Sequence, residues 1–512
     1  MLVKTYAAAV YGISATLITI EVNCTKGIQF FLVGLPDVAV RESHERIVSA
    51  LQVNGYAFPR SRVVINMAPA DIKKEGSAYD LPLAVGILAA AGTLSHEHLS
   101  RFMLMGELSL DGSLQPIKGA LPIAVKAREA GFQGLILPRQ NACEAAVADG
   151  LEVYGVNNLR EVIEFFSGQR ELEQTTVDVY DELFRQPHEG ATDFSDVRGQ
   201  ENVKRALEVA AAGGHNLIMI GPPGSGKSML AKRLPTILPP LTLQEALETT
   251  KIHSVAGKMG THTGLLMQRP FRAPHHTISD VAMVGGGTFP QPGEISLAHN
   301  GVLFLDELPE FNRSVLEVLR QPLEDRHISI SRARFAVDYP ASFMLVASMN
   351  PCPCGYYNHP SRPCVCSPGA VQKYMNRISG PLLDRIDIQV EIVPVPFEKI
   401  SEQRPSEPSA AVRARVVRAC AVQKERFAVQ KGIYCNAQMG AKELHRYAVP
   451  DADSLALLKS AMQRLNLSAR AYDRILKVSR TIADLEEAEH ISAHHIAEAI
   501  GYRNLDRETW GA

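Results

Sequence analysis

The stretch of sequence that decides the fold reads Gly221, Pro222, Pro223, Gly224, Ser225, Gly226, Lys227 and Ser228. It matches the pattern G-x-x-x-x-G-K-[ST], in which glycines let backbone N–H groups turn inward around phosphate oxygen atoms. The lysine of this pattern reaches the β and γ phosphates of a nucleotide, and the last serine is a ligand of Mg²⁺. An apolar run precedes the loop and a helical pattern follows it, so the positive end of the helix points at the phosphates. The stretch predicts a nucleotide-binding loop rather than a glycine-rich surface turn.

Two acids follow a later apolar run, which extends from Gly301 to Leu305. We expect Asp306 to hold the water shell of Mg²⁺ and Glu307 to polarise the water that attacks the γ-phosphate. Such an acidic pair is common at strand ends, but downstream of a phosphate-binding loop it indicates nucleotide hydrolysis. ATP and Mg²⁺ are therefore the expected substrate and cofactor.

Two more polar residues belong to this pattern. Asn350 follows the apolar run from Phe343 to Ala347, and a polar side chain at that strand end can orient the attacking water. Arg385 is expected to reach the nucleotide of a neighbouring subunit as an arginine finger. The alternative for Arg385 is an ion pair with Asp384 or Asp387.

A further arginine begins a helical pattern near the C-terminus of the chain. We expect Arg470 to close over the phosphates as a second sensor, with Arg474 one turn later as its rival.

Composition limits the class of protein. The chain has 512 residues with a formal net charge of −2, 46% hydrophobic and 21% charged residues, which is typical of a globular chain of several domains. The net charge is close to zero and so gives no indication of a nucleic-acid or membrane partner. A DNA-binding surface must therefore be a local patch. The sequence has no apolar run that could span a bilayer and no signal-peptide pattern, and we expect a cytoplasmic protein without a membrane partner.

The pattern of apolar residues divides the chain into four parts. Residues 1–168 alternate strand and helix patterns, residues 169–193 are a polar linker, residues 194–400 contain the nucleotide site, and residues 401–512 are helical. The expected fold class is therefore α/β with a helical C-terminal region.

Four cysteines lie close together directly after Asn350, namely Cys352, Cys354, Cys364 and Cys366. Four thiolates can hold Zn²⁺ tetrahedrally, although paired zinc ligands are more often separated by two residues than by one. Free or redox-active thiols and disulfides are the alternatives, and His359 is an alternative ligand. A metal here would make the Asn350 loop rigid.

Several motifs outside the nucleotide site carry a family resemblance. These are residues 269–279 (RPFRAPHHTIS), 285–287 (GGG), 292–298 (PGEISLA), 350–355 (NPCPCG) and 377–385 (RISGPLLDR). Together with the nucleotide-site residues, they resemble the ComM/YifB family of magnesium-chelatase-like AAA+ ATPases over essentially the whole chain.

The resemblance implies an AAA+ core, an insert between about Gly257 and Pro292, and a β-hairpin over residues 327–337. It also implies a ring, with a hexamer as the expected assembly, that moves on branched or single-stranded DNA. The implied activity is branch migration of recombination intermediates during natural transformation. Arg332 and Arg334 of the hairpin are candidates to grip DNA phosphates, or they form a solvated basic turn. A chelatase-type remodelling ATPase and a nucleotide-gated assembly platform are the alternatives.

The N-terminal part resembles Lon-type protease domains, a fold shared with ribosomal protein S5 domain 2, in residues 105–120 and 135–139. An ungapped match places Ala78 at the position of the nucleophile and Leu121 at that of the catalytic lysine. Ser77 and Lys118 are offset by one and three residues, and a Ser–Lys pair requires hydrogen-bond contact. We therefore expect a scaffold without protease activity.

Overall fold

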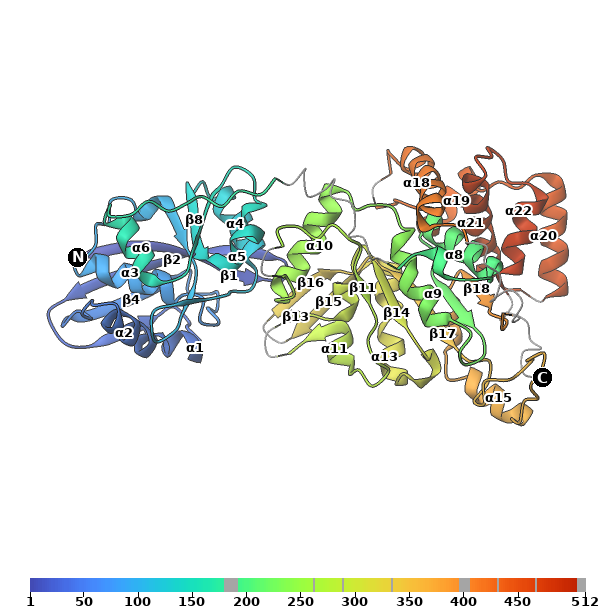
Figure 1. Ribbon diagram of the computed structural model, residues 1–512, viewed down its shortest axis with the longest axis horizontal. Helices are drawn as coiled ribbons and strands as arrows, with labels where there is room; N and C mark the ends of the chain where they lie inside the picture. Colours follow the sequence, from blue (N-terminus) through green and yellow to red (C-terminus); the bar gives the residue numbers. More distant parts are fainter. Residues whose placement is uncertain are drawn as a thin grey trace.

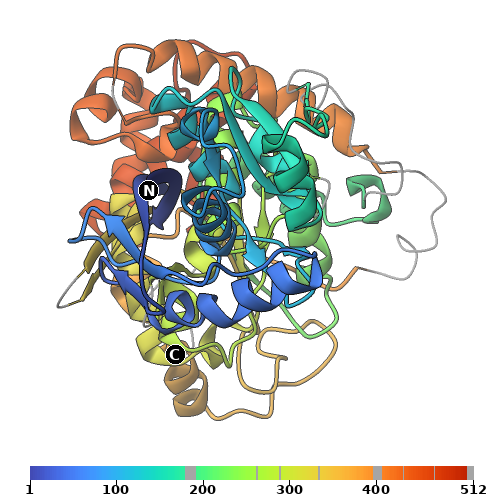
Figure 2. The same ribbon diagram turned by 90° about the vertical axis from the view of Figure 1, so that its left-hand side faces the viewer.

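A sheet of seven strands and a second sheet of five strands organise the chain (Figure 1). The computed structural model describes residues 1–178, 192–260, 263–287, 290–332, 335–395, 406–430, 432–465 and 467–503. Most of the expected linker, and Arg334 of the expected hairpin, lie outside these residues. Figure 2, which faces the N-terminal end, shows the seven-stranded part in front of the rest of the molecule.

The N-terminal sheet has the strand order β3-β4-β2-β1-β5-β8-β9. Its strands are β1 (Leu2–Tyr11), β2 (Ser14–Thr25), β3 (Phe30–Val33), β4 (Arg62–Ala68), β5 (Phe102–Leu104), β8 (Gly134–Pro138) and β9 (Glu152–Val156), with a small ribbon of β6 (Glu107–Leu108) and β7 (Leu114–Gln115). Its helices are α1 (Val38–Arg41), α2 (Ser43–Val53), α3 (Asp80–Ala90), α4 (Ala120–Glu129), α5 (Arg139–Ala146) and α6 (Leu159–Phe166). Every residue of α3 is buried, as expected for a helix whose residues after Asp80 are all apolar.

The second sheet is parallel, with the order β11-β14-β17-β10-β18. Its strands are β10 (Leu217–Ile220), β11 (Phe271–Arg272), β14 (Val302–Leu305), β17 (Met344–Met349) and β18 (Ile388–Glu391). The three central strands β14, β17 and β10 are buried throughout, because helices cover both faces of a parallel sheet and favour continuous apolar runs.

Helices and two short ribbons surround this sheet. They are α8 (Glu201–Gly213), α9 (Lys227–Arg233), α10 (Leu243–Val255), α11 (Asp280–Val284), α12 (Glu294–Leu297), α13 (Arg313–Val318), α14 (Arg320–Asp325), α15 (Pro368–Met375), α16 (Gly380–Leu383), β12 (Gly285–Gly286) with β13 (Gln291–Pro292), and β15 (His327–Arg332) with β16 (Phe335–Pro340).

The C-terminal region is helical. It consists of α18 (Ser409–Arg426), α19 (Ala441–Tyr447), α20 (Ala452–Arg464), α21 (Ala469–Leu485) and α22 (Ala493–Gly501). Buried apolar residues of α18, α21 and α22 join those of α8, β10 and β18 in one cluster. The helical region and one face of the parallel sheet therefore share a hydrophobic core.

The structure agrees with the predicted hairpin, but only in part with the predicted insert. The predicted hairpin is confirmed and extends from His327 to Pro340, with Ile328 and Ile330 buried and Ser329 and Ser331 exposed. The expected insert is only partly correct, because β11 lies inside it and forms the edge strand of the parallel sheet.

The N-terminal part contacts the parallel-sheet part at two places. Leu121 and Val147 pack with Leu241, Ala246 and Leu265 in a small apolar cluster. At the second place, the turn between β1 and β2 lies on the β15–β16 hairpin, where the Tyr11 hydroxyl donates to the carbonyl oxygen of Ala336 at 3.1 Å. None of the helices among the described residues is both long and apolar enough to cross a membrane.

Candidate nucleotide-hydrolysis site

The predicted site residues meet at one edge of the parallel sheet. Strands β14, β17 and β10 are neighbours and run in the same direction, so the residues that follow them lie side by side. Asp306 follows β14, Asn350 follows β17, and Gly221 follows β10. Ligands of open α/β sheets bind at this carboxyl edge.

The phosphate loop turns sharply at two glycines. Gly224 and Gly226 have φ values of +77° and +90°, a left-handed conformation that glycine adopts without a steric penalty. The second turn places Lys227 at the start of α9. The Lys227 ammonium donates to the carbonyl oxygens of Gly221 at 2.8 Å and Pro222 at 2.9 Å, and to Asn350 Oδ1 at 3.3 Å. Burial lowers the pKa of Lys227, and the carboxylates of Asp306 and Glu307 oppose that shift.

The oxygen atoms that would hold Mg²⁺ are already in contact. Ser228 Oγ donates to Asp306 Oδ2 at 2.7 Å, and Ser348 Oγ donates to Asp306 Oδ1. A hydroxyl and a carboxylate oxygen are ligands that Mg²⁺ prefers beside a nucleotide. The loop, Ser228 and Asp306 therefore fit a Mg²⁺–nucleotide complex.

Glu307 lies at the rim of this site. Its backbone is left-handed, with φ +54°, and its side chain is 58% exposed. Glu307 Oε2 lies 3.9 Å from His276 Nδ1, and the His276 ring packs edge-on against Phe311. The segment that carries His276 thus reaches the carboxylate that is expected to polarise water.

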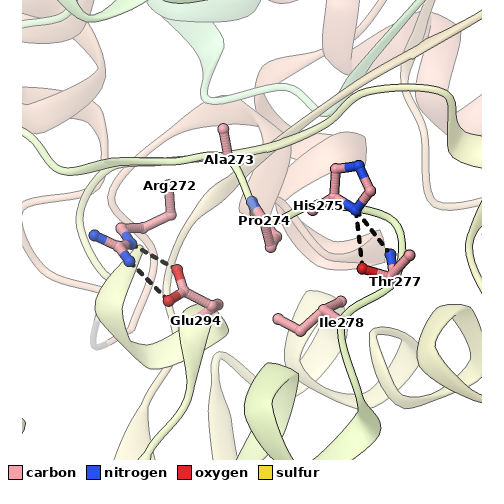
Figure 3. A pocket seen from close by; sticks show the side chains of 7 residues that line it. All are labelled: Arg272, Ala273, Pro274, His275, Thr277, Ile278 and Glu294. Atoms are coloured by element: carbon pink, nitrogen blue, oxygen red, sulfur yellow. Dashed lines mark hydrogen bonds and ion pairs between the residues drawn. The ribbon is translucent and has the colours of Figure 1, made fainter.

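A pocket of about 340 Å³ adjoins that segment (Figure 3). One wall is the bidentate ion pair of Arg272 with Glu294, with N–O distances of 2.6 and 2.7 Å. On the other side, His275 Nδ1 and Thr277 Oγ1 are 2.9 Å apart. The motif at 269–279 therefore forms a structured rim beside Glu307 rather than part of the phosphate loop.

Arg385 lies at the opposite edge of the sheet. Its carbonyl oxygen accepts a hydrogen bond from Asn216 Nδ2 at 3.0 Å, and Asn216 precedes β10, whereas the phosphate loop follows β10. The four residues of β10 separate the two ends by roughly 13 Å. The guanidinium pairs with Glu324 and donates to the carbonyl oxygen of Pro381 at 2.6 Å, so its ion-pair partner in this structure is Glu324 rather than Asp384 or Asp387.

Arg470 lies beside Arg385. Its guanidinium donates to Asp384 Oδ2 at 2.7 Å, and it lines a pocket of about 140 Å³ together with Arg385. Arg470 therefore lies at the edge of the sheet opposite the phosphate loop of its own chain. It cannot close over those phosphates in this arrangement.

Arg474, the rival of Arg470, is held by a buried network. Its guanidinium donates to Asp387 Oδ1 at 2.7 Å, and His215 Nδ1 lies 3.0 Å from Asp387 Oδ2. The Asp387 carboxyl is fully buried, yet Arg474 and His215 hold its pKa below the ordinary value against the effect of burial. Arg474 thus neutralises a buried charge.

The four clustered cysteines come together after Asn350. The Sγ atoms of Cys352, Cys354, Cys364 and Cys366 all lie within 4.8 Å of one another. All four are free thiols in this structure, so the disulfide alternative is not realised here.

The N-terminal part does not assemble a Ser–Lys pair. Leu121, at the expected lysine position, is buried against the ATP-site half of the chain. The Lys118 side chain lies beside Gly257, and among the described residues no hydrogen bond or ion pair joins it to Ser77. Lys74 is buried, and its ammonium donates to the carbonyl oxygen of Pro69.

Three residues of the site were assigned no individual role by the sequence analysis. Ser348 orients Asp306, Glu324 holds Arg385, and His276 faces Glu307. Ser348 was identifiable in principle, because it is a polar residue next to the last position of β17, the strand beside β14 in the sheet. Glu324 and His276 come from distant segments, and no spacing in the sequence connects them to their partners.

Comparison with known proteins agrees with this geometry. Residues 193–400 match the family described as magnesium chelatase, subunit ChlI, residues 20–141 match the subunit ChlI of Mg-chelatase, and residues 406–503 match the ChlI C-terminal family. The chain is 45% identical to the competence protein ComM of Haemophilus influenzae over 505 residues, which cover 98% of this chain and 97% of that protein.

The chain belongs to the ComM/YifB family of magnesium-chelatase-like AAA+ ATPases. It is also 45% identical to the uncharacterized protein YifB of Salmonella typhimurium, over 98% of this chain and 97% of that protein. Lon protease 2 of Bacillus subtilis is 31% identical over 28% of this chain and 27% of its own. This ComM/YifB protein therefore combines a Lon-like α/β part, an AAA+ ATPase core that uses ATP and Mg²⁺, and a helical C-terminal region.

Proposed function

We propose that this ATPase is a ring-forming motor that moves on DNA, and that it promotes branch migration of recombination intermediates during natural transformation. The observation that carries the proposal is the position of Arg385 at the sheet edge opposite the phosphate loop. A single chain contains both the phosphate loop and Arg385, but the two lie at opposite edges of its sheet. A second copy that presents Arg385 to the phosphate loop of its neighbour completes the site, and repetition of this contact closes a ring.

Within the site, each residue has a defined task. Lys227 neutralises charge on the β and γ phosphates, and the N–H groups of the loop hold their oxygen atoms. Bound Mg²⁺, held by Ser228 and Asp306, supplies further charge neutralisation. Glu307 accepts a proton from, and orients, the attacking water, and Asn350 holds that water beside the γ-phosphate. Arg385 of the neighbouring chain stabilises the charge that develops during transfer.

Arg470 joins Arg385 in the same proposed contact. The two guanidinium groups line one pocket, and Arg470 is 70% exposed. An exposed arginine beside the finger is placed to meet the phosphates of the adjoining chain. We propose that Arg470 acts on the neighbour's nucleotide, and we favour a hexamer.

The proposal of DNA as the substrate draws on the hairpin and on a relative. The β15–β16 hairpin has a buried inner face and a polar outer face, and Arg332 ends its first strand. Basic side chains at such a tip suit contacts with DNA phosphates. The relative from Haemophilus influenzae is named a competence protein, which favours a role in transformation, and we propose that this role is cytoplasmic.

We also propose Zn²⁺ as a bound metal at the four clustered cysteines. Soft thiolate ligands in a four-membered cluster suit Zn²⁺ better than Mg²⁺ or Ca²⁺.

The experiment compares ATP turnover without DNA, with duplex DNA and with a four-way junction, and follows movement of the junction in the same samples. We expect the junction to stimulate turnover and to be processed. Lys227→Ala should abolish both activities, whereas Lys232→Ala, which changes an exposed lysine on the same helix, should leave both intact. An ATP turnover rate that is the same with and without DNA, together with no movement of the junction, would overturn the DNA proposal. It would favour a remodelling ATPase of the chelatase type, or, if turnover is negligible, an assembly platform.

A further inference from the structure

The segment that carries the four cysteines has almost no hydrophobic core. Between residues 351 and 367 the structure has no helix or strand, and only Pro351, Cys352 and Gly355 are buried. A segment of this kind cannot be ordered by apolar burial alone, and small units of this type need a metal or a disulfide.

The sulfur atoms have the spacing of a metal site. Cys352 Sγ lies 3.3 Å from Cys354 Sγ and 3.6 Å from Cys364 Sγ, and the Cys354 and Cys364 sulfurs are 3.5 Å apart. A disulfide requires about 2.05 Å between sulfur atoms. Tetrahedral zinc with Zn–S distances of about 2.3 Å separates its sulfurs by about 3.8 Å. The observed spacing is close to that of a zinc site.

The cysteine segment packs directly on the phosphate loop. Gly355 has φ +85°, and its N–H donates to the carbonyl oxygen of Cys352 at 3.0 Å. A Cβ atom at this position would lie 2.5 Å from Pro223 Cδ and 2.8 Å from Pro223 Cγ. The turn formed by the first cysteine pair is therefore in close contact with the second proline of the phosphate loop.

Both ends of the segment also meet at Asn350. Cys352 follows Asn350 by two residues, and beyond the far end of the segment the Asn350 backbone opposes the rise that burial causes in the pKa of the Tyr374 hydroxyl. Asn350 in turn holds the Lys227 ammonium. The cysteine cluster is thus connected to the phosphate loop through Pro223 and through Asn350.

We propose that zinc at Cys352, Cys354, Cys364 and Cys366 is a clamp that keeps the phosphate loop in its nucleotide-binding conformation. The metal closes the segment, the closed segment presses Gly355 against Pro223, and Asn350 stays in contact with Lys227. Loss of the metal releases both contacts and lowers the affinity for nucleotide. The inference rests on the proposed zinc and on nucleotide binding by the loop, and it does not depend on DNA or on the ring.

The test measures zinc content by elemental analysis and affinity for a fluorescent ATP analogue on the same full-length samples. We expect one zinc per chain. The double variant Cys364→Ser with Cys366→Ser, remote from the phosphate loop in sequence, should lose the zinc and bind nucleotide at least about tenfold more weakly. Circular dichroism verifies that its helices and sheets persist.

A second variant tests the contact without removing a ligand. Gly355→Ala should retain zinc and weaken nucleotide binding, because its methyl group overlaps Pro223. Gly432→Ala is the matched control, since Gly432 has a similar φ of +83° but no atom within 4 Å of the added methyl group; it should change neither quantity. Wild-type protein without zinc, or a zinc-free double variant with unchanged nucleotide affinity, would overturn the clamp. If the DNA proposal fails, the expected zinc content and nucleotide affinity stay the same.

Discussion

Ser228 Oγ donates a hydrogen bond to Asp306 Oδ2 at 2.7 Å, although the two residues are 78 positions apart in the chain. The same carboxylate accepts a second hydrogen bond from Ser348 on the strand between them in the sheet. The phosphate loop, the acidic strand end and the sensor strand are therefore joined through one aspartate. The site depends on the order of the strands as much as on the residues themselves.

Ser348→Ala should lower kcat for ATP hydrolysis about 10- to 100-fold, because a hydrogen bond to a charged group contributes about 1.5–3 kcal/mol. The affinity for ATP should change little, since Lys227 and the loop N–H groups remain. Steady-state kinetics separates kcat from KM. Ser314→Ala, which removes an exposed hydroxyl bonded to Asp280, is the control and should behave like wild type. A loss of affinity equal to the loss of kcat would contradict a role in orienting Asp306.

Mixing two inactive variants should restore ATP turnover. Arg385→Ala keeps a complete phosphate loop, and Lys227→Ala keeps a complete arginine finger, so some contacts in a mixed assembly unite a wild-type Lys227 with a wild-type Arg385. Each variant alone should be reduced by about 10³-fold or more. Turnover is measured across mixing ratios. If every mixture is as inactive as its parents, although the chains assemble together, Arg385 does not act on a neighbour.

Arg474→Ala should destabilise the fold by about 2–3 kcal/mol, because it removes one partner of a buried carboxylate. The effect stays below the ~3–5 kcal/mol of a wholly uncompensated buried charge because His215 still bonds to Asp387. Arg470→Ala, one turn earlier on the same helix, breaks only an exposed pair and should cost about 0–1 kcal/mol. Denaturant titration gives both values. Equal destabilisation by the two variants would refute the buried role of Arg474.

Glu144→Gln should alter how stability depends on pH. Glu144 is buried between the N-terminal part and the ATPase core, where Leu121 N–H and Ser254 Oγ donate to its Oε1. Burial raises the pKa of Glu144 above its ordinary value of 4.5. Its contribution to stability is therefore present below that ordinary value and is lost as pH rises through the raised pKa.

The glutamine variant keeps the accepting oxygen and does not titrate. The free energy of unfolding of Glu144→Gln, relative to wild type, should therefore rise as the pH increases above the ordinary value of 4.5, until the pH passes the raised pKa of Glu144. Urea titrations at several pH values provide the comparison. A difference that is constant across this range would show that Glu144 does not titrate within it.

Much of the ATPase core could be predicted from short stretches of sequence. The glycines and Lys227 of the phosphate loop, the apolar strand before Asp306 and the alternation of Ile328 with Ser329 each predict a structure from neighbouring residues. Those elements were found as expected, because backbone conformation and burial periodicity are encoded within a few positions. The edge strand β11 was not predicted, since two residues are too short to show a period.

The contacts between residues far apart in the sequence could not be predicted in this way. Arg385 pairs with Glu324, and Arg470 lies away from the phosphate loop of its own chain, because the direction of β18 sets which sheet edge they occupy.

The sequence by itself determined which chemical groups this protein offers: a phosphate-loop motif, an acidic pair directly after an apolar strand, and four cysteines in one segment. Only the tertiary structure decided how these groups combine. It put Ser348 on Asp306, the cysteine turn on Pro223, and Arg385 at the far edge of the sheet. The physical reason is that residue type and spacing specify local conformation, whereas strand order and packing bring together groups that no local interaction connects.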